Sequence, residues 1–135
     1  MDLQAVFDKQ IELNKKINDS LYETIKTDSE EKRKWFLNFY LAMQQEGAEA
    51  VDSLSWKWWK KMDEDWDNIK IELVDMLHFW VSMCTVADMD AKEVLDLYFK
   101  KNDLNHKRQN EGYKEGTYQK EVDGVEDNVT HVLNK

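Results

Sequence analysis

The sequence has 135 residues, of which 41% are hydrophobic and 35% are charged, so we expect one folded domain with a heavily solvated surface. The formal net charge of −9 argues against a general nucleic-acid-binding protein, although a carboxylate cluster that holds divalent cations can still bind anionic ligands. The single cysteine, Cys84, excludes an internal disulfide, and no apolar run is long enough for a signal peptide or a membrane span, so we expect a cytoplasmic protein.

Helical periodicity runs through most of the chain, which contains no proline and carries three of its four glycines in the last quarter. The spacing of apolar residues predicts a first helix from the N-terminus to about residue 27 and a second that Ser29 caps. A third helix is expected to start at Asp65 or Asp67, and a fourth to run from about Asp90 to Arg108.

The segment after Arg108 is polar and contains glycine, and no stretch shows the alternation of a β-strand. The sequence therefore predicts an all-α protein with a four-helix core. Within this single domain we expect a helical core over residues 1–110 and an irregular C-terminal arm over residues 111–135.

Two pairs of carboxylates have helical spacing. Glu46 and Glu49 lie three residues apart on the second predicted helix, and Glu72 and Asp75 lie three apart on the third, so each pair shares one helix face. Their neighbours are apolar, and burying like charges together is costly unless a cation binds them. Mg²⁺ prefers carboxylate, water and phosphate oxygens. The pattern therefore predicts a divalent-cation site.

Two other interpretations of these acids are open. Either pair alone is better explained as surface acids with lysine partners, for which Lys57, Lys60 and Lys70 are available, but two such pairs reverse that preference. His78 lies three residues after Asp75, as in di-iron helical bundles. No histidine lies near the first acidic pair, so Mg²⁺ or Mn²⁺ fits better than iron.

Several segments, in order, resemble the dimeric dUTPases of the all-α NTP pyrophosphatase superfamily, which also contains the MazG-like enzymes. These segments are KQIELN, EGAEAVDSLSWKWWKK, NIKIELVDMLHFWVS, KKNDLNHKRQNEGYKEGTYQK and GVEDN. The two acidic motifs alone indicate only the superfamily, whereas the tryptophan–lysine segment, the HF dipeptide and the arm motif are more specific. The interval between the HF dipeptide and the fourth helix is short, so the chain resembles a compact phage or small bacterial member.

The resemblance implies Mg²⁺-dependent hydrolysis of dUTP to dUMP and pyrophosphate by a homodimer. Glu46, Glu49, Glu72 and Asp75 would hold roughly two or three Mg²⁺ ions, with Mn²⁺ as an alternative, and Glu49 would lie close to the attacking water. Larger family members attack the β-phosphorus and also accept dUDP, which extends the expectation to this chain.

The resemblance also implies the groups that bind the rest of the nucleotide. Cationic and polar side chains are expected to bind the phosphates, with Gly112 and Gly116 letting the arm bend over them; these are Lys57, Lys101, Asn105, Arg108, Tyr113, Lys120 and Asn128. Residues expected around the uracil and its nucleoside are Gln10, Asn14, Trp56, Phe79 and His78. From the residues alone, a polar helix face is the better explanation of Gln10 and Asn14, and at least one of Trp56, Trp58 and Trp59 is expected in the core.

Two further hypotheses are open. The first is a MazG-like pyrophosphatase with broader or different base specificity. The second, from another class, is a non-enzymatic acidic helical protein that binds a partner through its tryptophans, but it gives no reason for the arm motif.

Overall fold

The computed structural model describes all 135 residues and consists almost entirely of helices. The helices are α1 (Leu3–Ile17), α2 (Leu21–Thr27), α3 (Ser29–Asp52), α4 (Trp66–Val86) and α5 (Ala91–Asn110). The arm adds the short strands β1 (Glu121–Val122) and β2 (Val125–Glu126) and the π-helical turn η1 (Asn128–Val132). The predicted all-α class is confirmed. None of the helices combines the length and the apolar character that crossing a membrane requires.

By packing, the chain forms two compact units, Met1–Asp90 and Ala91–Lys135. The first unit contains α1 to α4, and the second contains α5 together with the arm. The expected division at residue 110, between a core and a closing arm, concerns function and stays a prediction. Packing assigns α5 to the same unit as the arm.

The prediction of one continuous first helix is wrong, because the chain breaks between α1 and α2. The Oδ1 atom of Asn18 accepts hydrogen bonds from the backbone N–H and the hydroxyl of Ser20, at 3.3 and 3.2 Å. Such local side-chain bonds compete with the helical backbone pattern. The break lets α2 turn, so that Leu21 and Ile25 pack against Val86 of α4.

The start of α3 also differs from the prediction. The capping residue is Asp28 rather than Ser29, and its Oδ1 atom accepts from the backbone N–H groups of Glu30 and Glu31, at 3.0 and 3.2 Å. A carboxylate at this position satisfies otherwise unpaired N–H groups and interacts favourably with the positive end of the helix dipole. Ser29 becomes the first residue of the helix.

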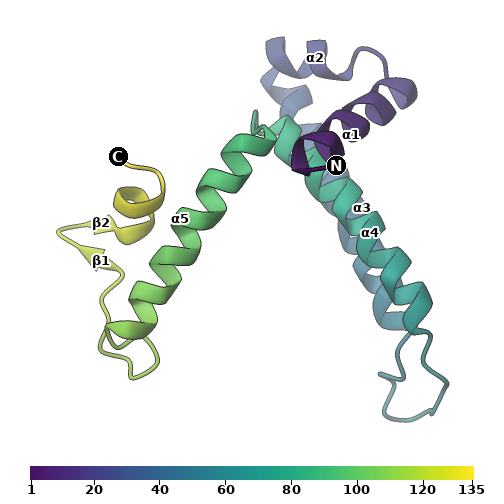
Figure 1. Cartoon of the computed structure of the whole chain (residues 1–135). Helices are drawn as coiled ribbons and strands as arrows, with labels where there is room; N and C mark the ends of the chain where they lie inside the picture. The colour runs from purple at the N-terminus through teal and green to yellow at the C-terminus, as the bar shows by residue number, and fades with distance from the viewer. The chain divides into compact units, whose positions relative to one another are not determined.

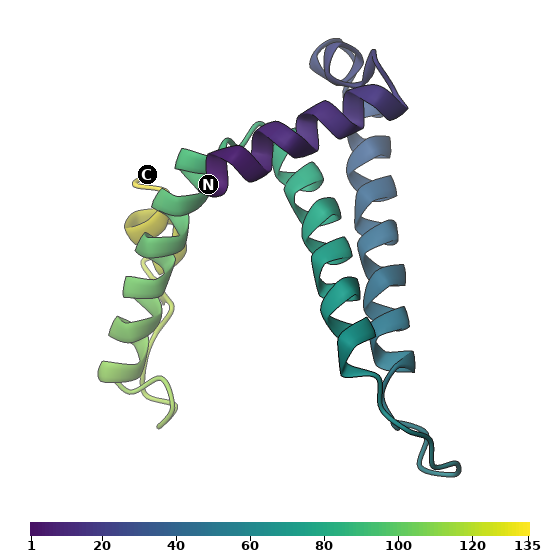
Figure 2. The same cartoon turned by 45° about the vertical axis from the view of Figure 1, so that its right-hand side comes forward.

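Helices α3 and α4 lie side by side and are joined by a loop over residues 53–65 (Figure 2). Asp65 caps α4 by accepting from the backbone N–H of Asn68 at 3.0 Å, which confirms one of the two predicted starts. The backbone N–H of Asp65 also donates to the carbonyl of Ser53 at 2.8 Å, which closes the base of the loop. The end of α3 therefore lies beside the beginning of α4.

The buried apolar residues of the first unit come from α1, α2 and α4, and they are Phe7, Leu21, Ile25, Ile69, Val81, Met83, Cys84 and Val86. One buried cluster consists of Leu21, Ile25 and Val86, with Tyr22, Trp35 and Phe39 packed against it. Helix α3 has no fully buried residue. Large apolar side chains of this helix stay exposed to solvent, namely Phe36, Leu37, Tyr40, Leu41 and Val51.

In the second unit, η1 packs against α5 and follows the β1–β2 hairpin (Figure 1). No strand was expected in the arm, but these two pair antiparallel, with Glu121 opposite Glu126. After α5 the chain reverses at Gly112, whose φ is +99°. A Cβ atom there would lie 1.9 Å from Oγ1 of Thr117, so this turn requires glycine.

Candidate active site

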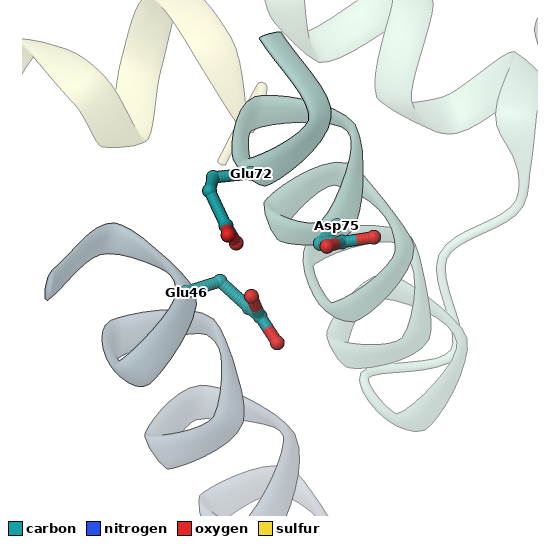
Figure 3. Close-up of side chains that lie close together, drawn as sticks. All are labelled: Glu46, Glu72 and Asp75. Carbon is teal, nitrogen blue, oxygen red and sulfur yellow. The ribbon is translucent and has the colours of Figure 1, made fainter. Parts of the chain in front are cut away.

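Carboxylates of α3 and α4 converge near the loop end of the α3–α4 pair (Figure 3). Ligand oxygens of Glu46, Glu72 and Asp75 all lie within 4.8 Å of one another. Glu46 lies in the last two turns of α3, and the other two lie in the first three turns of α4. The structure therefore brings three of the four predicted metal ligands together from two neighbouring helices.

Glu49 lies at the edge of this cluster. Its side chain is exposed and is not one of the three converging carboxylates. It still acts on Glu46, because it can accept a hydrogen bond from protonated Glu46 and because its negative charge disfavours ionisation there. Glu49 is thus the member of the four that is most open to solvent beside the cluster.

The cluster strongly disfavours ionisation of Glu46. When protonated, Glu46 can hydrogen-bond to Glu72 and to Glu49, and these bonds, burial, and repulsion from both neighbouring charges together raise the pKa of Glu46 to about 8. Every one of these causes raises the pKa. Ionised Glu46 would lose the hydrogen bonds, would lie partly out of water and would face two like charges. A bound cation would relieve this repulsion.

Glu72 carries the clearest sign of a missing partner. Its side chain is buried, and its Oε2 atom has no hydrogen-bond partner. Its Oε1 atom accepts from Nδ2 of Asn68 at 3.4 Å, and the same Nδ2 donates to the hydroxyl of Ser53 at 2.8 Å. Neither Asn68 nor Ser53 was predicted. The only sequence signal for Asn68 is its spacing of four residues before Glu72 on one helix face.

The four acids are not explained as surface ion pairs. None of them takes part in a salt bridge, and Lys70 instead pairs with Asp67 at 3.8 Å. A buried, unpartnered carboxylate oxygen among further carboxylates suits a hard cation such as Mg²⁺ or Mn²⁺. The residues present therefore fit the expected metal.

His78 does not join the cluster. Its Nδ1 atom lies 2.9 Å from the carbonyl oxygen of Val74 on the same helix. Because a carbonyl only accepts, Nδ1 carries the proton and Nε2 is left as an acceptor. The Glu-x-x-His arrangement of a di-iron bundle is not formed here.

A groove of about 430 Å³ lies between α1 and α4. Its lining is mainly apolar, with a few polar side chains: Met1, Asp2, Ala5, Val6, Lys9, Gln10, Leu13, Val74, Leu77 and His78. Two residues predicted to lie near the nucleoside, Gln10 and His78, are thus brought to one groove. None of the four predicted metal ligands lines this groove.

Gln10 and Asn14 do not lie on a solvated helix face. They are only 7% and 5% exposed, and Nε2 of Gln10 donates to Oδ1 of Asn14 at 2.9 Å. Asn14 in turn donates from Nδ2 to the hydroxyls of Tyr22 and Ser82, each at 3.0 Å. Asn14 is therefore part of a buried polar network that joins α1, α2 and α4.

The tryptophans of the loop are outside the core. Trp56, Trp58 and Trp59 are 48%, 90% and 58% exposed, so the expectation that at least one is buried is wrong. They pack mainly on one another, with ring centroids 5.8 Å apart for Trp56 and Trp59. The Nζ atom of Lys57 lies 5.9 Å from the Trp56 ring centroid. Phe79 is half-buried on α4, and neither it nor Trp56 lines the groove.

In the second unit, Arg108 is held by a residue that the sequence did not suggest. Its Nε and Nη2 atoms donate to the Asp127 carboxylate at 2.9 and 2.6 Å, and both side chains are buried. Tyr118 donates its hydroxyl to the same carboxylate at 2.7 Å. These bonds, led by that from Arg108, hold the pKa of Asp127 well below its usual range. The nearest sequence signal is the EDN motif, which contains Asp127 beside Asn128.

The other predicted phosphate-binding residues of this unit differ in exposure. Lys101 donates to Oδ1 of Asn128, whereas Asn105 is exposed and makes no side-chain contact. The Nζ atom of Lys120 lies 5.0 Å from the Tyr113 ring centroid, and its hydrogen bond and charge lower the pKa of Tyr113. Arg108 is buried, whereas Asn105 is exposed, so these predicted phosphate-binding residues do not share one solvent-exposed face.

A family model described as dUTPase matches residues 2–89 and 80–113. The chain belongs to the dUTPase family. The matched part of this dUTPase family member includes all four carboxylates, Gln10, Asn14 and Arg108, but not Lys120, Asp127 or Asn128. Membership agrees with the all-α NTP pyrophosphatase type that the sequence motifs suggested.

Two curated relatives of this dUTPase family member are phage proteins. The dCTP pyrophosphatase of Enterobacteria phage T4 is 39% identical over 79 residues, which cover 49% of this chain and 46% of the relative. The dCTP pyrophosphatase of Enterobacteria phage LZ5 is 36% identical over 79 residues with the same coverage. The chain thus spans about half the length of the curated relatives that it matches. No solved structure matches the chain significantly.

Proposed function

We propose that the chain is a Mg²⁺-dependent nucleotide pyrophosphatase that hydrolyses dUTP to dUMP and pyrophosphate. The observation that carries this proposal is the cluster of Glu46, Glu72 and Asp75, with its unpartnered buried oxygen, in a member of the dUTPase family. Membership in the family supports the reaction type, and the family description supports uracil as the base.

Mg²⁺ bound by Glu46, Glu49, Glu72 and Asp75 would lower the pKa of a water molecule and neutralise phosphate charge. Glu49, which is exposed beside the cluster, is proposed to accept the proton that the attacking water loses. Asn68 and Ser53 hold Glu72 in its orientation. Because the pKa of Glu46 is raised, binding of Mg²⁺ at this site would release a proton from Glu46 near neutral pH.

The base is proposed to bind in the α1–α4 groove, where Gln10 and His78 offer polar atoms in apolar surroundings. Trp56 of the loop and Phe79 of α4 are proposed to make apolar contacts with the nucleoside. The phosphates are proposed to bind Lys57, Lys101, Asn105, Arg108, Tyr113, Lys120 and Asn128. In Arg108 the contact with Asp127 uses Nε and Nη2, so Nη1 stays available for a phosphate oxygen.

A second candidate substrate is dCTP, because the phage relatives are named dCTP pyrophosphatases. Uracil and cytosine differ at the exocyclic group and at the ring nitrogen beside it. An amide side chain such as that of Gln10 can bind either edge, so the groove's residues are compatible with both.

We also propose that the protein acts as a homodimer. Helix α3 buries no residue fully, yet Phe36, Leu37 and Leu41 of this helix are 40%, 48% and 59% exposed. An apolar surface of this kind on a helix is typical of an interface. Sedimentation velocity at micromolar concentration tests this proposal, and a monomer at all concentrations would refute it.

The test of the function is a chromatographic product assay on dUTP, dCTP, dTTP and dUDP, with Mg²⁺ or with EDTA. We expect Mg²⁺-dependent formation of dUMP and pyrophosphate from dUTP, with dTTP spared. Glu72→Gln should lower turnover by at least about 100-fold, because even outer partners of metal ligands cost about 10–100-fold. Glu23→Gln, an exposed acid of α2, is the control.

The outcomes separate the candidates. Faster turnover of dCTP than of dUTP would replace the proposed substrate, and turnover of all four nucleotides would favour the broader MazG-like activity. No turnover of any nucleotide, with Mg²⁺ present, would favour the non-enzymatic binding protein.

A further inference from the structure

A buried chain of hydrogen bonds links α1, α2 and α4 behind the α1–α4 groove. It starts at Gln10, which lines the groove, passes through Asn14, and divides to Ser82 and to Tyr22. Tyr22 continues to Oγ1 of Thr85 at 3.0 Å. Ser82 is completely buried and Asn14 nearly so, which excludes water as an alternative partner for most of these atoms.

The direction of this chain is fixed at its two ends by backbone carbonyls. Ser82 donates its hydroxyl to the carbonyl of His78 at 2.8 Å, and Thr85 donates its hydroxyl to the carbonyl of Ser82 at 2.7 Å. A carbonyl accepts only, and a hydroxyl has one hydrogen to donate. Thr85 must therefore accept from Tyr22, and both Tyr22 and Ser82 must accept from Asn14.

This direction sets the orientation of two amide groups. Asn14 faces the two accepting hydroxyls, so its Nδ2 atom lies on that side and its Oδ1 atom faces Gln10. Gln10 must then turn Nε2 toward Asn14. Its Oε1 atom accepts no hydrogen bond from the protein and is not among the fully buried atoms that lack partners. This oxygen is available to a ligand in the groove.

We propose that Tyr22, Ser82 and Thr85 are positioning residues that restrict the groove to bases with a hydrogen-bond donor. Through Asn14 they hold the Gln10 carbonyl oxygen toward the ligand, so the ligand atom that meets it must be a hydrogen-bond donor. The ring N–H of uracil and the exocyclic amino group of cytosine both meet this requirement. This inference rests on the proposed function, because it assumes that a pyrimidine base binds in the groove.

The decisive probe is a substrate whose base has no donor. The 5′-triphosphate of the 2-pyrimidinone deoxyriboside lacks both the ring N–H and the amino group, and its base is smaller than uracil or cytosine. We compare kcat/KM for this probe with kcat/KM for the better of dUTP and dCTP. Wild type should prefer the natural substrate by at least about tenfold, since a missing hydrogen bond at a buried site is costly.

The key variant is Thr85→Val, which keeps the shape of the side chain but removes the hydroxyl. Tyr22 then loses its acceptor and can donate to Asn14, and both amides can turn over once Ser82 also turns its hydroxyl from the His78 carbonyl to Asn14. The preference should fall to within about threefold, mainly through KM for the natural substrate. Tyr22→Phe should act in the same direction. Thr85→Ser keeps the hydroxyl and should keep the wild-type preference.

Thr24→Val is the matched control, because the Thr24 hydroxyl makes no hydrogen bond and lies on α2 outside the chain of bonds. If Thr85 had only a structural role, Thr85→Val would lower kcat/KM for the probe and for the natural substrate by the same factor. The ratio of the two values would then stay unchanged. An unchanged ratio in Thr85→Val would therefore overturn the proposal, as would an equal change in Thr85→Ser.

A second readout does not depend on turnover. In a ¹⁵N NMR spectrum, the two Nδ2 hydrogens of Asn14 should exchange slowly with solvent in wild type and in Thr85→Ser, and faster in Thr85→Val. If wild type hydrolyses no nucleotide, the proposed function fails. The exchange rates of the Asn14 Nδ2 hydrogens then test by themselves whether Tyr22, Ser82 and Thr85 hold Asn14 in one orientation. Exchange in wild type as fast as that of the exposed Gln44 amide would refute them.

Discussion

Glu46 of α3 and Glu72 of α4 face each other across the two helices, and the hydrogen bond that they form when Glu46 is protonated is the largest of the causes that raise the pKa of Glu46 to about 8. Carboxylates can bond in this way only while one of them keeps a proton. Glu49 and the surrounding burial act in the same direction. If the proposed divalent cation binds here, it competes with this proton for one position between α3 and α4.

The first prediction concerns pH and stability. The pKa of Glu46 is about 8 in the folded chain and about 4.3 when unfolded, so the folded state keeps a proton that the unfolded state loses between these values. With EDTA present, the melting temperature should thus fall as the pH rises from 5 to 8, measured by circular dichroism. Glu46→Gln should flatten this slope and be more stable than wild type at pH 8. Glu23→Gln should keep the wild-type slope.

The stabilisation that Mg²⁺ gives to the fold should have the opposite pH dependence. Because the cation displaces the proton, the stabilisation that Mg²⁺ gives should grow from pH 6 to pH 8. Stabilisation by Mg²⁺ that is equal at both values would contradict the competition between proton and cation at Glu46.

Asn68 should control the metal affinity although it is not proposed as a ligand. It donates to Glu72 at 3.4 Å and to Ser53 at 2.8 Å, so it ties a ligand to the closed base of the loop. Asn68→Ala should weaken Mn²⁺ binding by about 10–100-fold, as measured by titration calorimetry. Asn38→Ala removes an exposed amide of α3 that makes no hydrogen bond, and it should bind Mn²⁺ like wild type.

The Arg108–Asp127 pair should determine the stability of the second unit. Asp127→Asn leaves a buried guanidinium without its counter-charge and should destabilise this unit by about 3 kcal/mol at pH 7, measured by hydrogen exchange of the α5 amides. The lowered pKa of Asp127 means that its stabilisation is complete above about pH 4 and is lost as the pH falls further.

The difference in stability of the second unit between wild type and Asp127→Asn should therefore shrink below about pH 4. Asp123→Asn is the control, because Asp123 is exposed and its positive φ of 53° suits asparagine equally well. A difference that stays constant down to pH 2 would show that the charge of Asp127 is not what stabilises the unit.

Gly47 offers a prediction that is independent of any ligand. It lies inside α3, and a Cβ atom there would meet only the Met76 side chain, at 3.6 and 3.8 Å, which is ordinary contact. Gly47→Ala should therefore raise the free energy of unfolding by roughly 0.5–1 kcal/mol, since alanine is the better helix former. Chemical denaturation measures this change, and a loss of stability would mean that α3 and α4 pack more tightly here than the structure shows.

Local features of the sequence determined the helices and the pairing of acids within each helix. Apolar spacing gives α3, α4 and α5, and three-residue spacing puts Glu46 with Glu49 and Glu72 with Asp75, because both follow from the fixed rise and turn of a helix. The break at Asn18 was missed, although its cause is also local, since a side chain competes there with the helical backbone.

Only the tertiary structure decided which residues meet across elements. Asn14 reaches Ser82 over 68 positions of sequence, and Arg108 reaches Asp127 over 19. The tertiary structure alone also determines that the loop tryptophans are exposed and that one oxygen of Glu72 has no partner. Helical periodicity fixes which side chains share a face, but the register and angle at which two helices pack depend on the whole set of contacting side chains, which no local pattern specifies.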